Sequence, residues 1–255
     1  MIHNTAIIEG NVKLGQNVTV GPFAYIHGDV TIGDGTEIGP NVHIEGYVSI
    51  GQRNKIYHAA YLGAPPQDVA WKGGQSFVSV GDDNLIREFV QIHRGTKEGT
   101  TTTMGSNCML MAGVHLAHNT KVGNEVIIAN NTVLAGYVEV DDFCFVSGLV
   151  GFHQFVKIGK YCMISGMSRI NMDCVPYMIH EGNPSRIAGI NIVGLRRRGF
   201  SEERRRTIKN LYKLLVRSKL NTTQAVERIK AEYGNDPDGQ EMLAFIERSD
   251  RGINK

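Results

Sequence analysis

The residue types best suited to catalysis lie in residues 114–119, Val-His-Leu-Ala-His-Asn, of a chain of 255 residues. Histidine titrates near neutral pH and is the commonest general base, which singles out His118, flanked by His115 and Asn119. Gly136 follows His118 after 18 residues, and Gln154 follows Gly136 after 18 more. Because glycine leaves its backbone N–H accessible, Gly136 would suit an oxyanion donor if residues 18 apart were neighbours in space.

A repeat with a period of six residues predicts that they are neighbours. A large apolar residue recurs at every sixth position from Ile8 to Leu62 and again from Met104 to Ile170, with a second small or β-branched residue four positions after most of them. This period is typical of a parallel β-helix, in which each hexapeptide is a short strand and a turn, and three hexapeptides close one coil. Coils stack roughly 4.8 Å apart, as strands of a sheet do. His118, Gly136 and Gln154 are therefore predicted to form one vertical row.

Two stretches interrupt the repeat, at about residues 64–77 and 94–103, and are predicted to be loops ejected from the β-helix. The first contains two prolines, two glycines and the only tryptophan, and it carries Gln67 and Asp68. The repeat fades after Ile170, and from Ser201, a candidate N-cap, the apolar residues follow helical spacing. We expect an all-β solenoid over residues 1–190 and a C-terminal α-helical domain over residues 191–255.

Composition narrows the class of protein. The chain is 42% hydrophobic and 20% charged, an ordinary balance for a globular protein. No stretch reaches the roughly 18 apolar residues of a membrane span, and the first residues lack the features of a secretory signal, so a cytoplasmic location is expected. The cysteines fall at inward positions of the repeat and are expected to be buried thiols of a reducing compartment: Cys108, Cys144, Cys162 and Cys174. Histidines of the first coils are expected on surface turns: His3, His27, His43 and His58.

Charge is distributed unevenly. The net charge is only +2, but residues 196–217 hold nine basic residues against two acidic ones, a local excess of +7. Such a patch suggests an acidic macromolecule or phosphates as partner. No nucleic-acid-binding motif is present, so nucleic acid is not expected.

Several motifs together resemble one known family. They are His115-Leu116-Ala117-His118, Leu134-Ala135-Gly136, His153-Gln154-Phe155, Glu181-Gly182-Asn183-Pro184 and Gly194-Leu195-Arg196-Arg197-Arg198-Gly199-Phe200. The chain is similar over nearly its whole length to the acyl-carrier-protein-dependent UDP-N-acetylglucosamine O-acyltransferases of lipid A biosynthesis. The resemblance implies a left-handed parallel β-helix, a homotrimer with active sites between subunits, and helices that help to dock acidic acyl carrier protein. It implies no cofactor and no metal, since the acyl donor is a phosphopantetheine thioester on the carrier.

The resemblance also implies roles for individual residues. His118 matches the general base and the Gly136 N–H matches the oxyanion donor of a transfer of a 3-hydroxyacyl chain to the 3-position of the UDP-sugar. Asp68 would reach the sugar from a neighbouring subunit. Further substrate-binding matches are Gln67, His115, His153 and Gln154 around the sugar and pantetheine, and Asn191, Arg197 and Arg198 at the nucleotide. Gly166, with the bulky Met167 and Arg169 beside it, matches the acyl-chain pocket and favours a shorter chain than the longest in the family.

Four positions depart from the family pattern. Asn119 stands where an aspartate commonly orients the base, Tyr137 replaces a histidine, Ala70 a lysine and Val193 a glutamate. An amine is easier to activate than a hydroxyl, so N-acylation of a 3-amino UDP-sugar remains an alternative. The related N-acyltransferase of the next lipid A intermediate is disfavoured, since it has an additional N-terminal domain whereas the repeat here begins within the first ten residues.

Two further alternatives belong to other classes. Trimeric β-helix carbonic anhydrases share the six-residue period, but they bind zinc through an H-x4-H pair, whereas His115 and His118 are separated by two residues. A purely structural solenoid is the remaining possibility, and the two ejected loops and the clustered histidines argue against it.

Overall fold

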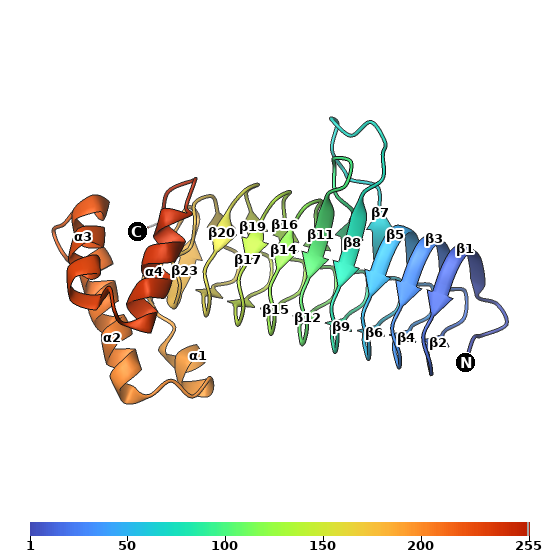
Figure 1. Cartoon of the computed structure of the whole chain (residues 1–255), viewed down its shortest axis with the longest axis horizontal. Helices are drawn as coiled ribbons and strands as arrows, with labels where there is room; N and C mark the ends of the chain where they lie inside the picture. Colours follow the sequence, from blue (N-terminus) through green and yellow to red (C-terminus); the bar gives the residue numbers. More distant parts are fainter. Residues whose placement is uncertain (254) are drawn as a thin grey trace.

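The computed structural model describes residues 1–253 and 255. It shows a parallel β-helix followed by helices stacked at one end of it (Figure 1), which confirms the predicted fold class of a β-solenoid with a helical C-terminal part. The register confirms the coil length, because Ile7 pairs with Tyr25 and Tyr25 with His43, each 18 residues further on.

The coils form a prism with three faces. The first face contains β7 (Tyr61–Ala64), β10 (Gln91–His93), β13 (His115–Leu116), β16 (Val133–Leu134), β19 (Gly151–Phe152) and β22 (Arg169–Ile170). The second contains β8 (Phe77–Val80), β11 (Thr101–Met104), β14 (Lys121–Val122), β17 (Glu139–Val140) and β20 (Lys157–Ile158). The third contains β2 (Thr19–Val20), β4 (Glu37–Ile38), β6 (Lys55–Ile56), β9 (Leu85–Ile86), β12 (Met109–Leu110), β15 (Ile127–Ile128), β18 (Phe145–Val146) and β21 (Met163–Ile164).

The core is the column of inward side chains. Ile26, Ile44, Leu62, Leu116 and Leu134 are fully buried, as the six-residue period predicts. All four cysteines are buried and free, which confirms the prediction for them. Each coil alone would expose its apolar positions, so stacking supplies the burial that holds the solenoid together.

Each coil turns at three corners. We call the corner between the first and second faces the first corner, that between the second and third faces the second corner, and that between the third and first faces the third corner. In the later coils each corner has one residue in the left-handed region, as at Asn119, Glu125 and Asn131 with φ values of 61°, 54° and 56°. The residue before it then projects outward, which is where His118 lies.

The first coils lack a turn at the first corner. There β1 (Ile7–Leu14), β3 (Tyr25–Ile32) and β5 (His43–Ile50) run through both faces as strands of eight residues. The expectation of one short strand and a turn in every hexapeptide is therefore wrong in this part. Gly10, Gly28 and Gly46, with φ between 82° and 107°, let the strand bend without a turn. His27 and His43 consequently lie within strands and not on turns.

Both ejected loops leave at the first corner. Residues 65–76 connect β7 to β8, and residues 94–100 connect β10 to β11. They lie side by side (Figure 1), because the Gly99 N–H donates to the Gln75 carbonyl at 2.9 Å. The second loop is shorter than predicted, since Thr101 to Thr103 pair with β8 as part of β11.

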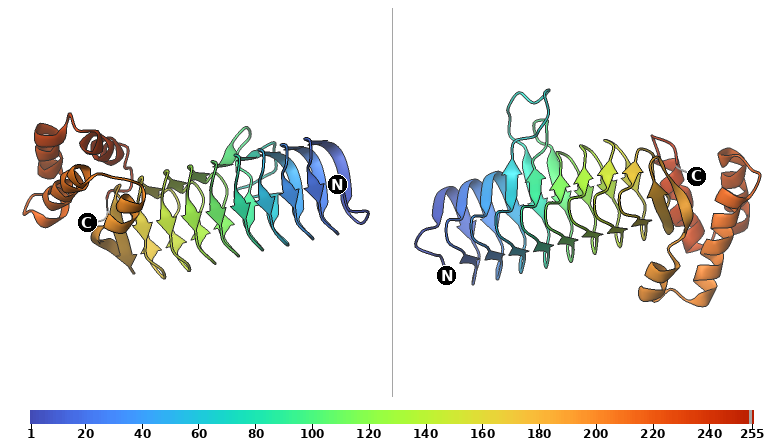
Figure 2. Two further views of the ribbon diagram at one scale, coloured as in Figure 1. Left: turned by 90° about the horizontal axis from the view of Figure 1, so that it is seen from below. Right: turned by 180° about the vertical axis from the view of Figure 1, so that it is seen from behind.

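The C-terminal part begins with an antiparallel hairpin, β23 (Met178–Gly182) and β24 (Ser185–Ile190), that the repeat does not predict. It leads into α1 (Ile192–Arg197), α2 (Glu202–Tyr212), the π-helix η1 (Lys213–Arg217), α3 (Thr222–Tyr233) and α4 (Pro237–Glu247), which cap this end of the solenoid (Figure 2). Ser201 is the N-cap of α2, as predicted, since its Oγ accepts from the Arg204 N–H at 3.2 Å. No helix among the described residues is long and apolar enough to cross a membrane.

Candidate active site

His118 lies at the first corner, directly above the point where the two loops emerge. Its side chain is 12% exposed, so it is largely enclosed while still reachable. The ring contacts the edge of the Tyr137 ring, with the two centroids 5.3 Å apart. The turn that projects His118 outward depends on Asn119 in the left-handed conformation, which asparagine tolerates better than most residues.

Asn119 determines which nitrogen of His118 carries the proton. The backbone N–H of Thr96 donates to Asn119 Oδ1 at 3.0 Å, so this atom is the amide oxygen. His118 Nδ1 lies 3.1 Å from the same oxygen and must therefore donate to it. In the neutral imidazole Nε2 is then the acceptor, which is the form that a general base requires.

Gly136 packs against the His118 ring. A Cβ added to Gly136 would lie 2.2 Å from His118 Cε1 and 2.4 Å from Nε2, so only glycine fits there. Among the described residues, no acceptor is bonded to the Gly136 N–H. The vertical row extends to Gln154, whose neighbour Phe155 donates its N–H to the Gly136 carbonyl at 3.1 Å. Sequence spacing alone thus located these three residues together.

Asp68 lies beside His118 of its own chain. Asp68 Oδ2 is 3.7 Å from His118 Nε2, and Asp68 Oδ1 accepts from the Ala70 N–H at 2.8 Å. Within one chain Asp68 therefore already lies beside His118, and its approach to a sugar held by a neighbouring subunit stays a prediction. The physical reason is that residues 65–76 leave the solenoid at the first corner, so their path passes over the site of the same chain. Gln67, next to Asp68, is exposed.

Two further histidines are kept neutral near the site. His93 is buried, its Nδ1 lies 2.7 Å from the Pro65 carbonyl, and burial lowers its pKa. Burial, with His93 and His118 nearby, lowers the pKa of His115 to about 4. The His93 and His115 rings lie 5.0 Å apart. At neutral pH these rings serve as uncharged polar surface and place no cation next to His118.

Thr96 and His93 have no role that the sequence alone predicts. Thr96 Oγ1 donates to Asn119 Oδ1 at 3.0 Å, so it accepts from the Tyr137 hydroxyl at 3.1 Å. This chain of bonds holds the amide that orients His118. The signal that could have identified both residues is the position of residues 92–96, one coil before His118 along the first face. His153 and Gln154 are exposed at the same corner, with His153 Nδ1 donating to the Gln154 carbonyl at 3.1 Å.

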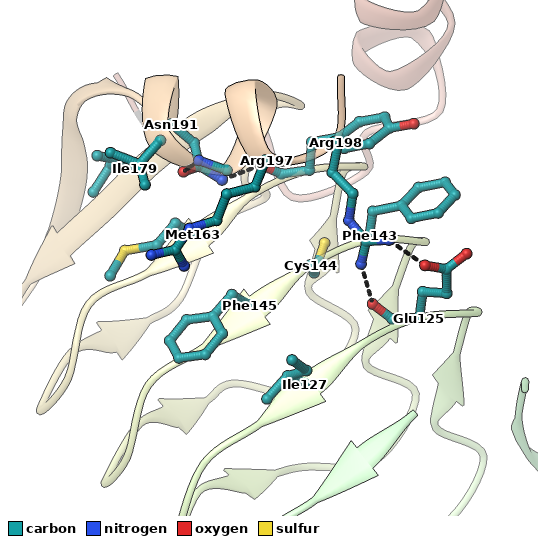
Figure 3. A pocket seen from close by; sticks show the side chains of 13 residues that line it. Glu125, Ile127, Phe143, Cys144, Phe145, Met163, Ile179, Asn191, Arg197 and Arg198 are labelled. Atoms are coloured by element: carbon teal, nitrogen blue, oxygen red, sulfur yellow. Dashed lines mark hydrogen bonds and ion pairs between the residues drawn. The ribbon is translucent and has the colours of Figure 1, made fainter. Parts of the chain in front are cut away.

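A second candidate region is a pocket of about 390 Å³ at the second corner, between the third face and α1 (Figure 3). Arg197 and Arg198 point into it over an apolar strip of Ile127, Phe145 and Met163. Arg198 forms an ion pair with Glu125 and lies over the Phe143 ring, with its Cζ 4.9 Å from the ring centroid. Arg197 is exposed and has no ion-pair partner among the described residues.

Asn191 lines this pocket but its side chain is already engaged. Its Oδ1 accepts from the Gly194 N–H at 3.0 Å, which caps α1, and its Nδ2 donates to the Tyr161 carbonyl at 2.8 Å. Val193, at the pocket rim, is 60% exposed and offers no polar group to a ligand. Asn191 therefore holds α1, and with it Arg197, against the solenoid.

The third corner carries the residues expected around an acyl chain. Gly166 packs against the Gly148 carbonyl, and Met167 beside it is 77% exposed. Arg169 lies on β22 of the first face, where it pairs with Gly151. The candidate residues are thus divided among three edges of the prism, and one chain does not bring them together.

The basic segment is only partly neutralised. Arg204 forms a bidentate pair with Asp238, through bonds of 3.0 and 2.7 Å. Among the described residues, Arg196, Arg206, Lys209 and Lys213 are exposed without an ion-pair partner. The one group of three candidate metal ligands among the described residues consists of His27, His43 and Glu45 and includes neither His115 nor His118.

Comparisons with known proteins were made for sequence and fold. A family model described as UDP N-acetylglucosamine O-acyltransferase, domain 2, matches residues 173–254, and a model of six bacterial transferase hexapeptide repeats matches residues 101–136. A relative from Aliivibrio fischeri (strain MJ11) is 48% identical over 99% of this chain and 97% of its own. One from Janthinobacterium sp. (strain Marseille) is 45% identical over 99% and 98%. Both are named acyl-(acyl-carrier-protein)–UDP-N-acetylglucosamine O-acyltransferase.

Solved structures agree with these relatives. A UDP-N-acetylglucosamine acyltransferase from Bacteroides fragilis 9343 is 42% identical, covers 100% of both chains and superposes with a TM-score of 0.97. One from Francisella novicida is 38% identical, covers 100% of this chain and 94% of its own, and gives a TM-score of 0.97. The similarity extends through the solenoid and the C-terminal helices.

Proposed function

Because the chain belongs to the acyl-carrier-protein-dependent UDP-N-acetylglucosamine O-acyltransferases, we propose that it transfers a 3-hydroxyacyl chain from acyl carrier protein to the 3-hydroxyl of UDP-N-acetylglucosamine, the first step of lipid A biosynthesis. The observation that carries the proposal is the orientation of His118. Its Nδ1 donates to Asn119 Oδ1, so Nε2 is free to accept a proton beside the Gly136 backbone.

In the proposed mechanism, His118 Nε2 takes the proton of the sugar 3-hydroxyl as its oxygen attacks the thioester carbonyl. The negative charge that develops on the carbonyl oxygen is stabilised by the Gly136 N–H. Collapse of this intermediate breaks the carbon–sulfur bond, and the departing thiolate recovers the proton from His118. Asp68, 3.7 Å from Nε2, stabilises the imidazolium that exists between the two steps. The transfer needs no cofactor, since the pantetheine thioester brings the acyl group.

The site is proposed to be completed in a homotrimer. Within one chain, His118 at the first corner and Arg197 at the second corner lie on different edges of the prism. Packing three prisms edge to edge would bring the first corner of one chain towards another corner of its neighbour. Arg197 and Arg198 then suit the diphosphate of the nucleotide, because guanidinium groups bind phosphate oxygens in a bidentate manner. Five further residues are proposed to line the sugar, pantetheine and nucleotide around these groups: Gln67, His115, His153, Gln154 and Asn191.

The acyl chain is proposed to extend from the first corner towards Gly166. Met167, exposed beside it, and Arg169 on β22 limit the space available, so we propose a chain shorter than the longest used in the family. The acyl carrier protein is proposed to dock on the unpaired cations of α1, α2 and η1, since the carrier is acidic. The proposed location is the cytoplasm, where buried free cysteines stay reduced.

One observation keeps the N-acyltransferase alternative open. Asn119 orients His118 without a negative charge, so it does not stabilise the imidazolium as a carboxylate would. An amine acceptor makes less demand on the base than a hydroxyl does. A transfer assay with purified protein, 3-hydroxyacyl carrier proteins of graded chain length and the two acceptors, UDP-N-acetylglucosamine and its 3-amino analogue, separates these cases. Preference for the hydroxyl sugar supports the proposal, preference for the amine supports the alternative, and no transfer to either overturns both.

A further inference from the structure

A cluster of metal-ligating side chains lies on the first face, several coils before the active site. It consists of His27 on β3 and of His43 and Glu45 on β5, whose candidate ligand atoms all lie within 4.8 Å of one another. His27 Nε2 is 3.2 Å and His43 Nε2 is 3.9 Å from Glu45 Oε2. The stacking of coils produces this arrangement, because His27 pairs directly with Glu45 in the parallel ladder.

Aromatic neighbours hold both imidazole rings. His27 stacks on Tyr25, with the ring centroids 4.5 Å apart and the planes inclined by 21°. His43 stacks on Tyr61, at 4.4 Å and 6°. Rings packed in this way have few rotamers open to them, so little conformational entropy is lost when their nitrogens bind a ligand.

The Glu45 carboxylate is oriented by a hydrogen bond to its other oxygen. The Tyr61 hydroxyl donates to Glu45 Oε1 at 2.7 Å, which leaves Oε2 directed towards the two histidines. A hydrogen bond to the outer oxygen of a ligating carboxylate is the usual support of a protein metal site.

His43 Nε2 has no hydrogen-bond partner within the described part of the chain, although the atom is buried. A buried polar atom without a partner is costly, and it is uncommon in folded proteins. The missing partner is accounted for if this nitrogen coordinates a cation.

The surrounding charge is compatible with a cation. The cluster opens into a pocket of about 430 Å³ that is also lined by Asp29 and Arg94. Glu9, bonded to the Tyr25 hydroxyl at 3.0 Å, lies at the next coil of the same face. The pocket thus holds two carboxylates, those of Asp29 and Glu45, against the one guanidinium of Arg94, whose Nη1 is already held by the Gly63 carbonyl at 3.1 Å.

We propose that His27, His43 and Glu45 form a zinc site, with the fourth position open to water or to a small ligand from the pocket. Two imidazoles and one carboxylate are a ligand set that zinc uses in tetrahedral sites with one open position. Bonds of about 2.0–2.2 Å in a tetrahedron separate ligand atoms by roughly 3.3–3.5 Å. The observed separations of 3.2 and 3.9 Å lie on either side of this range, so small side-chain rotations close the site.

Metal binding to the full-length protein tests the proposal without reference to acyl transfer. Protein freed of metal with a chelator is titrated with zinc chloride by calorimetry, and with cobalt(II), whose absorption bands reveal tetrahedral coordination. We expect one zinc per chain in the wild type. His43→Ala and Glu45→Gln should weaken binding at least 100-fold, and Tyr61→Phe by about 10- to 100-fold, as for other outer-sphere partners.

Two matched variants exclude other sites. His58→Ala removes a histidine whose ring centroid lies 5.5 Å from that of Phe89, and His118→Ala removes the proposed catalytic base. Both should bind zinc as the wild type does. Glu45→Gln retains an acceptor for Tyr61, so loss of zinc from this variant cannot be attributed to unfolding once its circular dichroism matches the wild type. Failure of the wild type to bind zinc, or undiminished binding by Glu45→Gln, would overturn the proposal.

Discussion

The first corner of the solenoid is built in two different ways along its length. In the early coils it is a row of glycines, Gly10, Gly28 and Gly46, through which the strands bend without interruption. In the later coils the same row contains His118, Gly136 and Gln154, and each is followed by a left-handed residue that makes a sharp turn. Between them the row passes through Arg94, beside the two ejected loops.

The difference shows how one repeat supports both a scaffold and a site. At a smooth corner, by which we mean one where the strand bends without a turn, the backbones are so close that a Cβ at Gly28 would lie 2.4 Å from the Gly46 carbonyl oxygen. No side chain can project there, and chemistry is left to the strand residues beside it, such as His27 and Glu45. A sharp corner, where the chain makes a turn, projects one side chain per coil into solvent. His118 therefore lies one coil after the ejected loops and one coil before Gly136, which packs against its ring.

Of the changes at the sharp corner, removal of the base His118 should reduce the rate of acyl transfer most. For His118→Ala we expect kcat for acyl transfer to fall by about 10²- to 10⁴-fold, the usual contribution of a positioned general base. Steady-state kinetics measures this, and circular dichroism verifies that the fold is unchanged. His58→Ala, at the third corner, is the matched control. Turnover within a factor of two of the wild type would show that His118 is not the base.

Filling the space next to the His118 ring should have the second-largest effect on kcat. For Gly136→Ala we expect kcat to fall by roughly 10²-fold, because the new methyl group collides with the His118 ring and displaces it. The fold should persist, since the neighbour is a side chain that can rotate. Gly189→Ala adds a methyl group with no atom within 4 Å and should leave kcat unchanged. Equal rates for the two variants would contradict the packing described here.

A substitution at the smooth corner should lower the free energy of unfolding and should not affect the catalytic step. For Gly28→Ala we expect a loss of about 3 kcal/mol in the free energy of unfolding, because the φ of +107° and the Gly46 backbone both reject a Cβ. Gly35→Ala is the control: its φ is +67°, but an added Cβ would lie 3.6 Å from the Arg53 side chain, an ordinary contact. About 1 kcal/mol is expected there. Urea unfolding compares the two, and similar losses would mean that close backbone approach is not what requires glycine.

The smallest expected difference between the early and the later coils is in how stability depends on pH. His43 and His115 occupy the same row of the first face, and burial lowers the pKa of both, that of His115 to about 4. The unfolded chain, with a histidine pKa near 6.5, then binds more protons between pH 6.5 and 4, so the free energy of unfolding falls as pH decreases through this interval.

His115→Gln should therefore reduce the loss of stability between pH 7 and pH 4.5 by on the order of 1 kcal/mol, after allowance for solvent screening. His43→Gln should have a smaller effect, because the Glu45 carboxylate opposes the shift at that ring. Urea unfolding at the two pH values, with chelator present, measures the difference. An equal or larger effect at His43 would contradict this ranking.

Much of the architecture follows from the six-residue period. Burial of two positions in each hexapeptide requires coils of 18 residues, so the row of His118, Gly136 and Gln154 follows by counting. The inward cysteines and the N-cap at Ser201 are equally local consequences. The eight-residue strands of the first coils are not, because glycine in a repeat is compatible with both a turn and a bend.

The site is predictable only where it belongs to the repeat. Asp68 lies 3.7 Å from His118 of its own chain, a contact that no position of the repeat predicts. Residues 65–76 have no period, and their path is determined by contacts such as that between Gly99 and Gln75. The bond from Thr96 to Asn119, which orients the base, arises in the same way from the second loop.

The solenoid, its coil length and the vertical row can be read from the amino-acid pattern, because they follow from burial that repeats along the chain. Three features emerge only from packing in three dimensions: which nitrogen of His118 is free, which loop covers it, and the convergence of His27, His43 and Glu45. These depend on side-chain orientations and loop paths set by neighbours distant in sequence. The placement of His118 and Arg197 on separate edges belongs to the same class, since it arises from the three-cornered cross-section and not from any local motif.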